Sequence, residues 1–247
     1  MTELFKQFDA YSLKARVFPA LIAGFPVLAL LFVLVPWDHL GVSHAIATAM
    51  GLVLLFAFSD LARSRGRKVQ KKLGSGETLN LWYRENKEIS EISKSRFRVY
   101  IAGKINQPIP TEEDESFRPE YANDFYRSAG DYIRDRTRDA SKFSILLGEN
   151  ITYGFRRNLL GLKPVSLLMN FIVLAICIAM IYWRPVSAIP IVHVDVKMYT
   201  VVVAAVLHSL YMLFAVNKGS VYEASKAYGR QLILSCDTVM MSSEDKG

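Results

Sequence analysis

The chain has 247 residues, of which 51% are hydrophobic, and a formal net charge of +7. Its mean hydropathy is +0.20 and its pI is near 9.3. Soluble domains of this length rarely combine so apolar a composition with so basic a pI, which argues against an ordinary soluble protein and for clustered apolar segments.

Four nearly uncharged segments carry most of the apolar residues. Each is about 19 residues long, enough for a helix to cross a hydrocarbon layer of roughly 30 Å. They are apolar on all sides, which is typical of membrane spans rather than of core helices in a soluble protein. We therefore predict a mainly α-helical protein with four transmembrane helices in two hairpins and a helical cytoplasmic domain inserted between them. The predicted parts are a cytoplasmic N-terminus (1–16), a first transmembrane hairpin (17–62), the cytoplasmic domain (63–163), a second hairpin (164–216), and a cytoplasmic C-terminal helix and tail (217–247).

The cations predict the orientation of these spans. Of the 30 lysines and arginines, 28 fall in the segments assigned to the cytoplasm, and only Arg184 and Lys197 fall in the outer loops. Positively charged loops stay on the cytoplasmic side of a membrane, and tryptophans such as Trp37 and Trp183 favour its interfaces. We therefore expect a multi-pass protein of a bacterial inner membrane, with both termini in the cytoplasm.

The first half of the cytoplasmic domain opens with a basic run, Arg63 to Lys72, directly after the second span. Such a run determines topology and offers a surface for anionic lipid headgroups. Beyond it, apolar residues at helical spacing predict an amphipathic helix that is capped by Thr78 and reaches Ile92. After an interruption at Ser93 to Ser95, the helical pattern continues to Ile105.

The second half of the domain begins with a turn and a capping box formed by Thr111 and Asp114. The short acidic helix that follows is expected to end or bend at Pro119. Its carboxylates, Glu112 to Glu115, are read as a solvated helix N-terminus rather than a cation site. A second amphipathic helix is expected from Tyr121 to about Asp139, with salt bridges in its charge-alternating end.

The cytoplasmic domain lacks the usual residues of catalysis. Between Arg63 and Lys163 the sequence contains no histidine and no cysteine, which removes histidine acid–base chemistry, cysteine nucleophiles and ordinary zinc sites. The chain also has no GxxxxGK[ST] and no GxGxxG motif. We expect a protein that is not an enzyme and that has no cofactor and no metal site.

The segment from Phe143 to Pro164 runs without a break into the third span and is rich in polar groups that are costly near a bilayer. One interpretation is that Arg156 and Arg157 anchor the helix by extending to the membrane surface. The other is that this face binds a small anion or lines the mouth of a pore, because arginines beside a tyrosine can grip a phosphate and stack on a base. The candidate ligand-binding or gating residues are Glu149, Asn150, Tyr153, Arg156, Arg157 and Asn158.

Polar residues are few inside the predicted spans. Asn170 and His208 are the candidates for lining a pore, because such groups face protein or water rather than lipid. An interhelical hydrogen bond is the alternative for His208. After the fourth span, the apolar stripe from Val221 to Ser235 predicts that the helix continues into the cytoplasm.

The segment around span three resembles a known group of proteins. Glu149-Asn150, Tyr153-Gly-Phe-Arg-Arg-Asn-Leu-Leu-Gly-Leu-Lys-Pro164, Arg136-Thr-Arg-Asp139 and the turn Pro110-Thr-x-x-Asp together resemble a family of uncharacterised bacterial four-helix membrane proteins. The architecture is also similar to that of four-transmembrane effectors of nucleotide-signalling antiphage systems. This resemblance implies an oligomer that opens or damages the inner membrane when it is triggered.

Two function classes follow. The first is a non-enzymatic effector in antiphage defence, a homo-oligomeric pore or ion channel, or a membrane-disrupting protein, gated by its cytoplasmic domain. The second is a membrane-anchored sensor or scaffold that recruits a protein partner and conducts nothing. An enzyme that binds a metal through Glu149 or Asp139 is a third alternative. The expected partners are the lipid bilayer, further copies of the chain, and a cytoplasmic nucleotide or protein as trigger, with no direct binding to nucleic acid.

Overall fold

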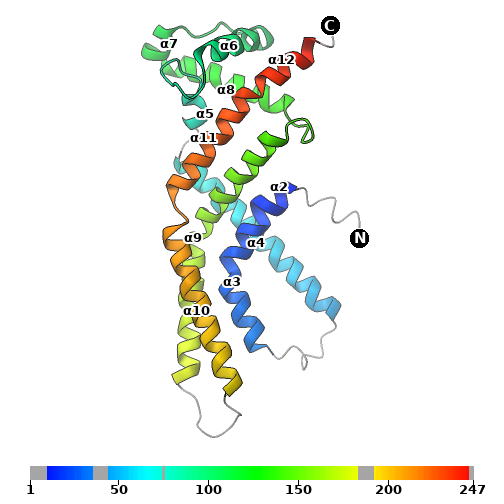
Figure 1. Ribbon diagram of the computed structural model, residues 1–247, viewed down its shortest axis with the longest axis vertical. Helices are drawn as coiled ribbons and strands as arrows, with labels where there is room; N and C mark the ends of the chain where they lie inside the picture. The colour runs from blue at the N-terminus through cyan, green and yellow to red at the C-terminus, as the bar shows by residue number, and fades with distance from the viewer. Residues whose placement is uncertain (1–9, 36–43, 74–75, 183–191, 245–247) are drawn as a thin grey trace. The chain divides into compact units, whose positions relative to one another are not determined.

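The structure is a computed structural model that describes residues 10–35, 44–73, 76–182 and 192–244. These residues form helices and turns without a strand, which confirms the predicted mainly α class. The helices drawn in Figure 1 are α2 (Ala10–Ser12), η1 (Leu13–Val17), α3 (Phe18–Leu34), α4 (His44–Leu73), α5 (Gly76–Asn80), α6 (Glu91–Ile105), α7 (Glu112–Phe117), α8 (Pro119–Arg136), α9 (Ser144–Tyr182), α10 (Val192–Phe214), α11 (Lys218–Leu234) and α12 (Cys236–Glu244).

The chain divides into two compact units. Unit 1 consists of Met1–Val69 and Gly154–Ser220, and unit 2 consists of Gln70–Tyr153 and Val221–Gly247. Helix α9 is uninterrupted although it begins in unit 2 and ends in unit 1, which agrees with the prediction that the segment before Pro164 runs directly into a span.

Three helical segments of the described residues are long and apolar enough to cross a membrane: Leu13–Leu34, Ser144–Tyr182 and Val196–Phe214. They match three of the four predicted segments and indicate a membrane protein. Their outward side chains are large and apolar, and Phe32 and Phe171 are 75% and 69% exposed. A protein surrounded by water would expose so extended an apolar surface only at a binding site, whereas lipid solvates it.

The second predicted segment lies in α4, which is not one of these three. Within this helix the uncharged stretch runs from His44 to Ser59, about 24 Å at 1.5 Å per residue, and Asp60 and a basic run follow it. The described residues therefore do not confirm a four-span layout. The predicted outer loops, with Trp37 and Trp183, lie outside the described residues.

Small and aliphatic side chains fill the interior of unit 1, where α9 and α10 lie side by side (Figure 1). Alanines on α3 and α4 allow the helices to approach closely, as is common where helices pack in membranes. One buried cluster consists of Ala20, Ala23, Ala62, Leu159, Leu162, Met212 and Val216. The other consists of Leu30, Val173, Cys177, Met198, Val201 and Ala205.

A close helix contact in unit 1 joins α4 to α9 through two glycines. A Cβ atom added to Gly161 would lie 2.6 Å from the carbonyl carbon of Arg65 and 2.7 Å from the backbone nitrogen of Gly66. A Cβ added to Gly66 would lie 1.9 Å from Oδ1 of Asn158. Because no side chain fits in these gaps, the two backbones meet only where both helices carry glycine.

The expectation that the fourth span continues unbroken into a C-terminal helix is wrong. Helix α10 ends at Phe214 and α11 begins at Lys218. Asn217 causes the break, because its Oδ1 accepts a hydrogen bond from the backbone N–H of Ser220 at 2.9 Å and so caps α11. On the other side of the break, the Lys163 ammonium donates to the carbonyls of Leu213 at 3.0 Å and Val216 at 2.8 Å, which stabilises the negative end of α10.

Unit 2 packs α6, α8, α11 and α12 around an aromatic core. The predicted stripe on α8 is confirmed, because Phe125, Ala129 and Ile133 are all buried. The predicted stripe on α11 is buried at Val221 and Ala224 as well. The core consists of Leu81, Trp82, Ile89, Phe97, Ile101, Ala122, Phe125, Tyr126, Ala129, Ile133, Phe143, Leu146, Leu232, Ile233, Cys236 and Val239.

The predicted capping box is confirmed at the start of α7. The Asp114 N–H donates to Thr111 Oγ1 at 3.1 Å, and Asp114 Oδ2 accepts from the Thr111 N–H at 2.8 Å. The expectation that the acidic residues here are all solvated is wrong for Asp114, which is 4% exposed, and for Glu115, whose side chain is 7% exposed. Glu115 accepts hydrogen bonds from Arg84 and from the Tyr126 hydroxyl, so it ties the preceding loop to α8.

The predicted helix from Thr78 to Ile92 is wrong. Helix α5 stops at Asn80, and α6 starts at Glu91 and runs without interruption through Ser93 to Ser95. In between, residues 81–90 form turns, because buried cations from α6 take the carbonyl groups that a helix would use. Lys94 donates to Asn86 O at 2.8 Å and to Tyr83 O, and Arg98 donates to Trp82 O at 2.7 Å.

Unit 2 is expected to lose stability in acid partly through Asp114. The hydrogen bond from the Thr111 backbone is the main cause that holds the pKa of Asp114 below its ordinary value of 3.8. A carboxyl group whose pKa is lower in the folded state stabilises the fold above its unfolded pKa, and this contribution is lost as the pH falls through the folded pKa. The Asp114→Asn variant should therefore be less stable than the wild type at pH 7, and its stability should fall less between about pH 4 and pH 2.

Thermal unfolding of the purified chain at stepped pH values measures this difference. Asp124→Asn is the control, because Asp124 is exposed and pairs only with Arg127 on the same helix. Equal acid sensitivity of the wild type and Asp114→Asn would contradict the assignment.

Candidate functional site

The six residues predicted to form a site on α9 fall on both sides of the unit boundary. Glu149, Asn150 and Tyr153 belong to unit 2, and the remaining three belong to unit 1. In unit 2, the Tyr153 ring stacks on Tyr228, with centroids 6.2 Å apart and planes 9° apart. Glu149 and Asn150 are half-buried on the same helix.

In unit 1, Asn158 is completely buried. Its Nδ2 donates to the carbonyl of Ala15 at 2.6 Å, and Gly154, one turn earlier on α9, packs against the same residue. This asparagine therefore joins α9 to η1 and presents no polar atom to a ligand. Arg156 is exposed and donates to Ser220 O at 3.0 Å, and Arg157 Nε lies 3.4 Å from Asn158 Oδ1.

The two polar residues predicted for the spans lie together in the interior of unit 1. Asn170 is 1% and His208 9% exposed, and Asn170 Nδ2 lies 3.0 Å from His208 Nδ1. Asn170 also donates to Ser209 at 2.8 Å. A third buried group, the Ser166 hydroxyl, donates to Ala23 O at 2.9 Å. These contacts are interhelical hydrogen bonds, the alternative that the sequence left open for His208.

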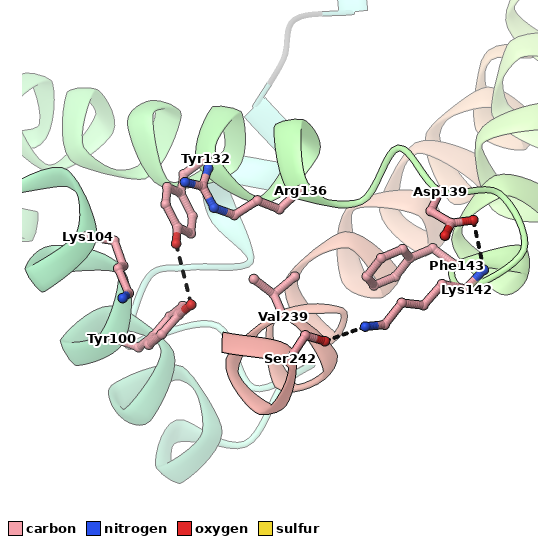
Figure 2. A pocket seen from close by; sticks show the side chains of 9 residues that line it. All are labelled: Tyr100, Lys104, Tyr132, Arg136, Asp139, Lys142, Phe143, Val239 and Ser242. Atoms are coloured by element: carbon pink, nitrogen blue, oxygen red, sulfur yellow. Dashed lines mark hydrogen bonds between the residues drawn. The ribbon is translucent and has the colours of Figure 1, made fainter. Parts of the chain in front are cut away.

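A cavity of about 430 Å³ in unit 2 offers a different site, which we term the tyrosine–cation pocket. Helices α6, α8 and α12 and the segment before α9 surround it (Figure 2). Aromatic rings and cations line the cavity together. The lining residues are Tyr100, Lys104, Tyr132, Arg136, Asp139, Lys142, Phe143, Val239 and Ser242.

Two pairs with the same spacing, a tyrosine followed one helical turn later by a cation, form one side of the pocket. On α8 the Arg136 guanidinium lies 3.7 Å from the ring centroid of Tyr132, and on α6 the Lys104 ammonium lies 5.6 Å from that of Tyr100. Residues four apart share a helix face, so each cation lies over its own ring. The two tyrosine hydroxyls meet at 3.4 Å, which joins α6 to α8 at the cavity wall.

The pocket has a positive electrostatic balance. Three cations, Lys104, Arg136 and Lys142, line the pocket together with one carboxylate, Asp139, which is engaged by its own turn. Its Oδ1 accepts from the Ser141 hydroxyl at 2.6 Å and the Ser141 N–H at 2.9 Å, and these hydrogen bonds lower the pKa of Asp139. Asp139 therefore shapes the turn before α9.

Tyr132 does not offset this positive charge. Burial, with the hydrogen bond between its hydroxyl and that of Tyr100 as a second cause, raises the pKa of Tyr132 to about 12. Its hydroxyl therefore stays protonated at neutral pH and is available as a neutral donor. The Lys142 ammonium contacts the Ser242 hydroxyl of α12. The pocket thus combines cationic and hydroxyl donors with the apolar surfaces of Phe143 and Val239, a combination that suits an anion with an apolar or planar part.

The sequence analysis missed this pocket because it interpreted the charged end of α8 as salt bridges. That interpretation is right for its neighbours: Arg134 pairs with Asp131 at 2.5 Å, and Arg138 with Asp135 at 2.7 Å. Arg136 lies farther from Asp135, at 3.8 Å, and turns to the Tyr132 ring instead. The sequence does carry a sign of the pocket, because Tyr100 and Tyr132 are each followed four residues later by a cation.

Among the described residues, no three histidine, cysteine, aspartate or glutamate side chains come together as a metal site. The pocket instead uses nitrogen cations and hydroxyls, which bind anions. No family model, curated protein or solved structure matches this chain.

Proposed function

We propose that this protein is a non-enzymatic, ligand-responsive membrane protein with four spans and cytoplasmic termini, in which unit 2 receives a small anion. The observation that carries the proposal is the tyrosine–cation pocket, which is lined by three cations and by a single carboxylate that is held by its own turn. A phosphate-bearing molecule fits this chemistry best, because arginine and lysine form charge-assisted hydrogen bonds with phosphate oxygens. The fourth span that we propose is His44 to Ala62, the apolar part of α4.

The proposed route of the signal is α9. Phe143 lines the pocket immediately before this helix begins, and the helix continues as an apolar segment long enough to cross a membrane. A ligand that orders the turn at Asp139 and Lys142 would therefore act on the first turn of a spanning helix. Such coupling requires only that the ligand favours one arrangement of this turn over another.

The response that we propose first is the opening of a homo-oligomeric pore in a bacterial inner membrane. The similarity in architecture to antiphage effectors supports it and suggests a nucleotide as the trigger. The second candidate is a sensor that recruits a partner without conducting. The buried polar groups of the spans favour the non-conducting sensor. Ser166, Asn170 and His208 all hydrogen-bond within one chain, so they would not line a pore between copies.

Binding to the pocket is testable with the purified full-length chain in detergent. Inorganic phosphate, pyrophosphate and nucleoside mono-, di- and triphosphates are the probes in calorimetric titrations. We expect at least one phosphorylated probe to bind, and Arg136→Gln and Lys142→Gln each to weaken it about 10- to 100-fold, because each removes one charge-assisted hydrogen bond. Arg127→Gln, an exposed cation on α8 outside the pocket, should leave the affinity unchanged. Equal losses in all three variants, or no binding of any probe, would refute the pocket assignment.

Flux measurements separate the two forms of the response. The chain is reconstituted in liposomes loaded with a small fluorescent dye, and the tightest probe is added outside and inside. Probe-dependent leakage that Arg136→Gln abolishes supports the pore. Binding without leakage supports the non-conducting sensor.

A further inference from the structure

A second group of cations lies in unit 1, where η1 and α4 both meet α9. These side chains are exposed and occupy consecutive turns of the two helices. We term them the junction cations: Lys14, Arg63, Arg65, Arg67 and Lys68.

Asn158 contacts both helix segments that carry these cations, η1 and α4. It hydrogen-bonds to the backbone of Ala15, beside Lys14, at 2.6 Å. Its side chain also fills the space over Gly66, which lies between Arg65 and Arg67. Both helices therefore touch the same residue of α9, and their cations cannot separate without breaking this contact.

The junction cations differ in their partners from those cations of unit 2 that form ion pairs. In unit 2, Arg84, Arg98 and Lys226 each pair with a glutamate. Among the described residues, none of the junction cations lies within ion-pair distance of a carboxylate. Exposed cations without a carboxylate partner attract anions.

Apolar side chains lie directly beside these cations. Leu13 and Phe18 flank Lys14 on the chain and are 37% and 42% exposed, and the segment that starts at Leu13 is one of the three candidate spans. Lys14 thus lies at the start of an apolar segment long enough to cross a membrane, and Arg63 to Lys68 follow the apolar part of α4. A soluble anion needs only the cations, whereas a lipid also uses the apolar surface next to them.

We propose that the junction cations bind the phosphate groups of acidic phospholipids and that this contact stabilises the crossing of η1 and α4 on α9. This inference concerns a site other than the tyrosine–cation pocket and holds whether or not that pocket binds a ligand. The lipid acts as a ligand of the folded chain, so it raises stability by RT ln(1 + L/Kd), where L is the lipid concentration.

Thermal unfolding of the full-length chain in a neutral detergent tests the proposal. The protein is titrated with phosphatidylglycerol, with phosphatidylcholine, or with glycerol 3-phosphate as the headgroup without acyl chains. In the Arg136→Gln variant, whose tyrosine–cation pocket is weakened, we expect the unfolding temperature to rise with phosphatidylglycerol and not with phosphatidylcholine or glycerol 3-phosphate, and the junction variants are made in this background. In Arg65→Gln/Arg67→Gln/Lys68→Gln the concentration of phosphatidylglycerol that gives a fixed rise in the unfolding temperature should increase roughly fivefold for each cation removed.

The matched control, Arg127→Gln/Arg134→Gln/Arg138→Gln, removes the same charge from exposed positions on α8 and just after it and should leave the titration unchanged. If the triple variant does not fold, Arg67→Gln alone should still weaken the lipid effect. Equal effects of phosphatidylglycerol and phosphatidylcholine, an equal loss in the control, or an effect of glycerol 3-phosphate as strong as that of the lipid would overturn the proposal. The pocket variant Arg136→Gln should show the wild-type lipid response, so the two sites can fail independently.

Discussion

Replacing Gly161 by alanine is expected to destabilise unit 1 by about 1 to 3 kcal/mol, the usual cost of forcing one extra methyl group into a packed contact. The new Cβ would lie 2.6 Å from the carbonyl carbon of Arg65. Because the obstructing atoms belong to the backbone of α4, a change of side-chain rotamer cannot relieve the clash, and the two helices must separate.

Gly148 provides the matched control on the same helix. A Cβ at this position would meet nothing within 4 Å, so Gly148→Ala should leave stability unchanged or raise it by up to about 1 kcal/mol, since alanine favours helix over glycine. Helix α4 offers the same comparison, with Gly66→Ala expected to destabilise and Gly51→Ala, also in open space, expected not to.

Reversible unfolding in mixed detergent and SDS micelles measures these differences. A double-mutant cycle adds a sharper test, because the Gly66 gap is filled partly by the Asn158 side chain. Gly66→Ala combined with Asn158→Ala should cost less than the sum of the two single variants. Equal stabilities of Gly161→Ala and Gly148→Ala would show that the two backbones are not in contact in the protein.

The second large effect is expected at Arg98. Its side chain is 2% exposed and donates to Glu91 at 2.7 Å and to Trp82 O at 2.7 Å. Replacing it by methionine keeps most of the volume but leaves the buried carbonyl without its donor. Hydrogen bonds to charged groups contribute about 1.5 to 3 kcal/mol each, so we expect unit 2 to lose roughly 2 to 4 kcal/mol.

Trp82 reports on this change directly, because it is buried in the core of unit 2. The chain has three tryptophans, so a Trp37→Phe/Trp183→Phe background makes the fluorescence specific to Trp82. Urea unfolding then compares Arg98→Met with Arg127→Met, whose exposed pair with Asp124 should contribute less than about 1 kcal/mol. A difference of less than 1 kcal/mol between the two variants would contradict a structural role for Arg98.

Local rules predicted part of unit 2 well. The capping box at Thr111 and the helix that starts near Pro119 depend on residues within one or two turns of each other, and both are confirmed. The turns at 81–90 were missed because their carbonyls are held by Lys94 and Arg98. These cations come from a neighbouring helix that the local pattern does not reveal.

The candidate sites also depend on contacts with neighbouring helices that the local sequence does not reveal. The polar density of the Tyr153 to Pro164 motif drew attention to α9, but composition cannot tell a ligand-binding asparagine from one that joins two helices. In the structure Asn158 lies at the point where η1 and α4 meet α9. The motif therefore encodes helix packing at Gly154, Asn158 and Gly161, and the pocket with an uncompensated charge lies elsewhere, among α6, α8 and α12.

The sequence by itself determined that this is a mainly helical membrane protein, because apolar segments of sufficient length and the clustering of cations are properties of composition along the chain. It also determined the helix starts that depend on neighbouring residues. Only the tertiary structure decided which polar groups are paired. The hydrogen bond between Asn170 and His208, the glycine contact between α4 and α9, and the tyrosine–cation pocket all join residues that are far apart in the chain. Their chemistry depends on distances that the order of residues does not specify.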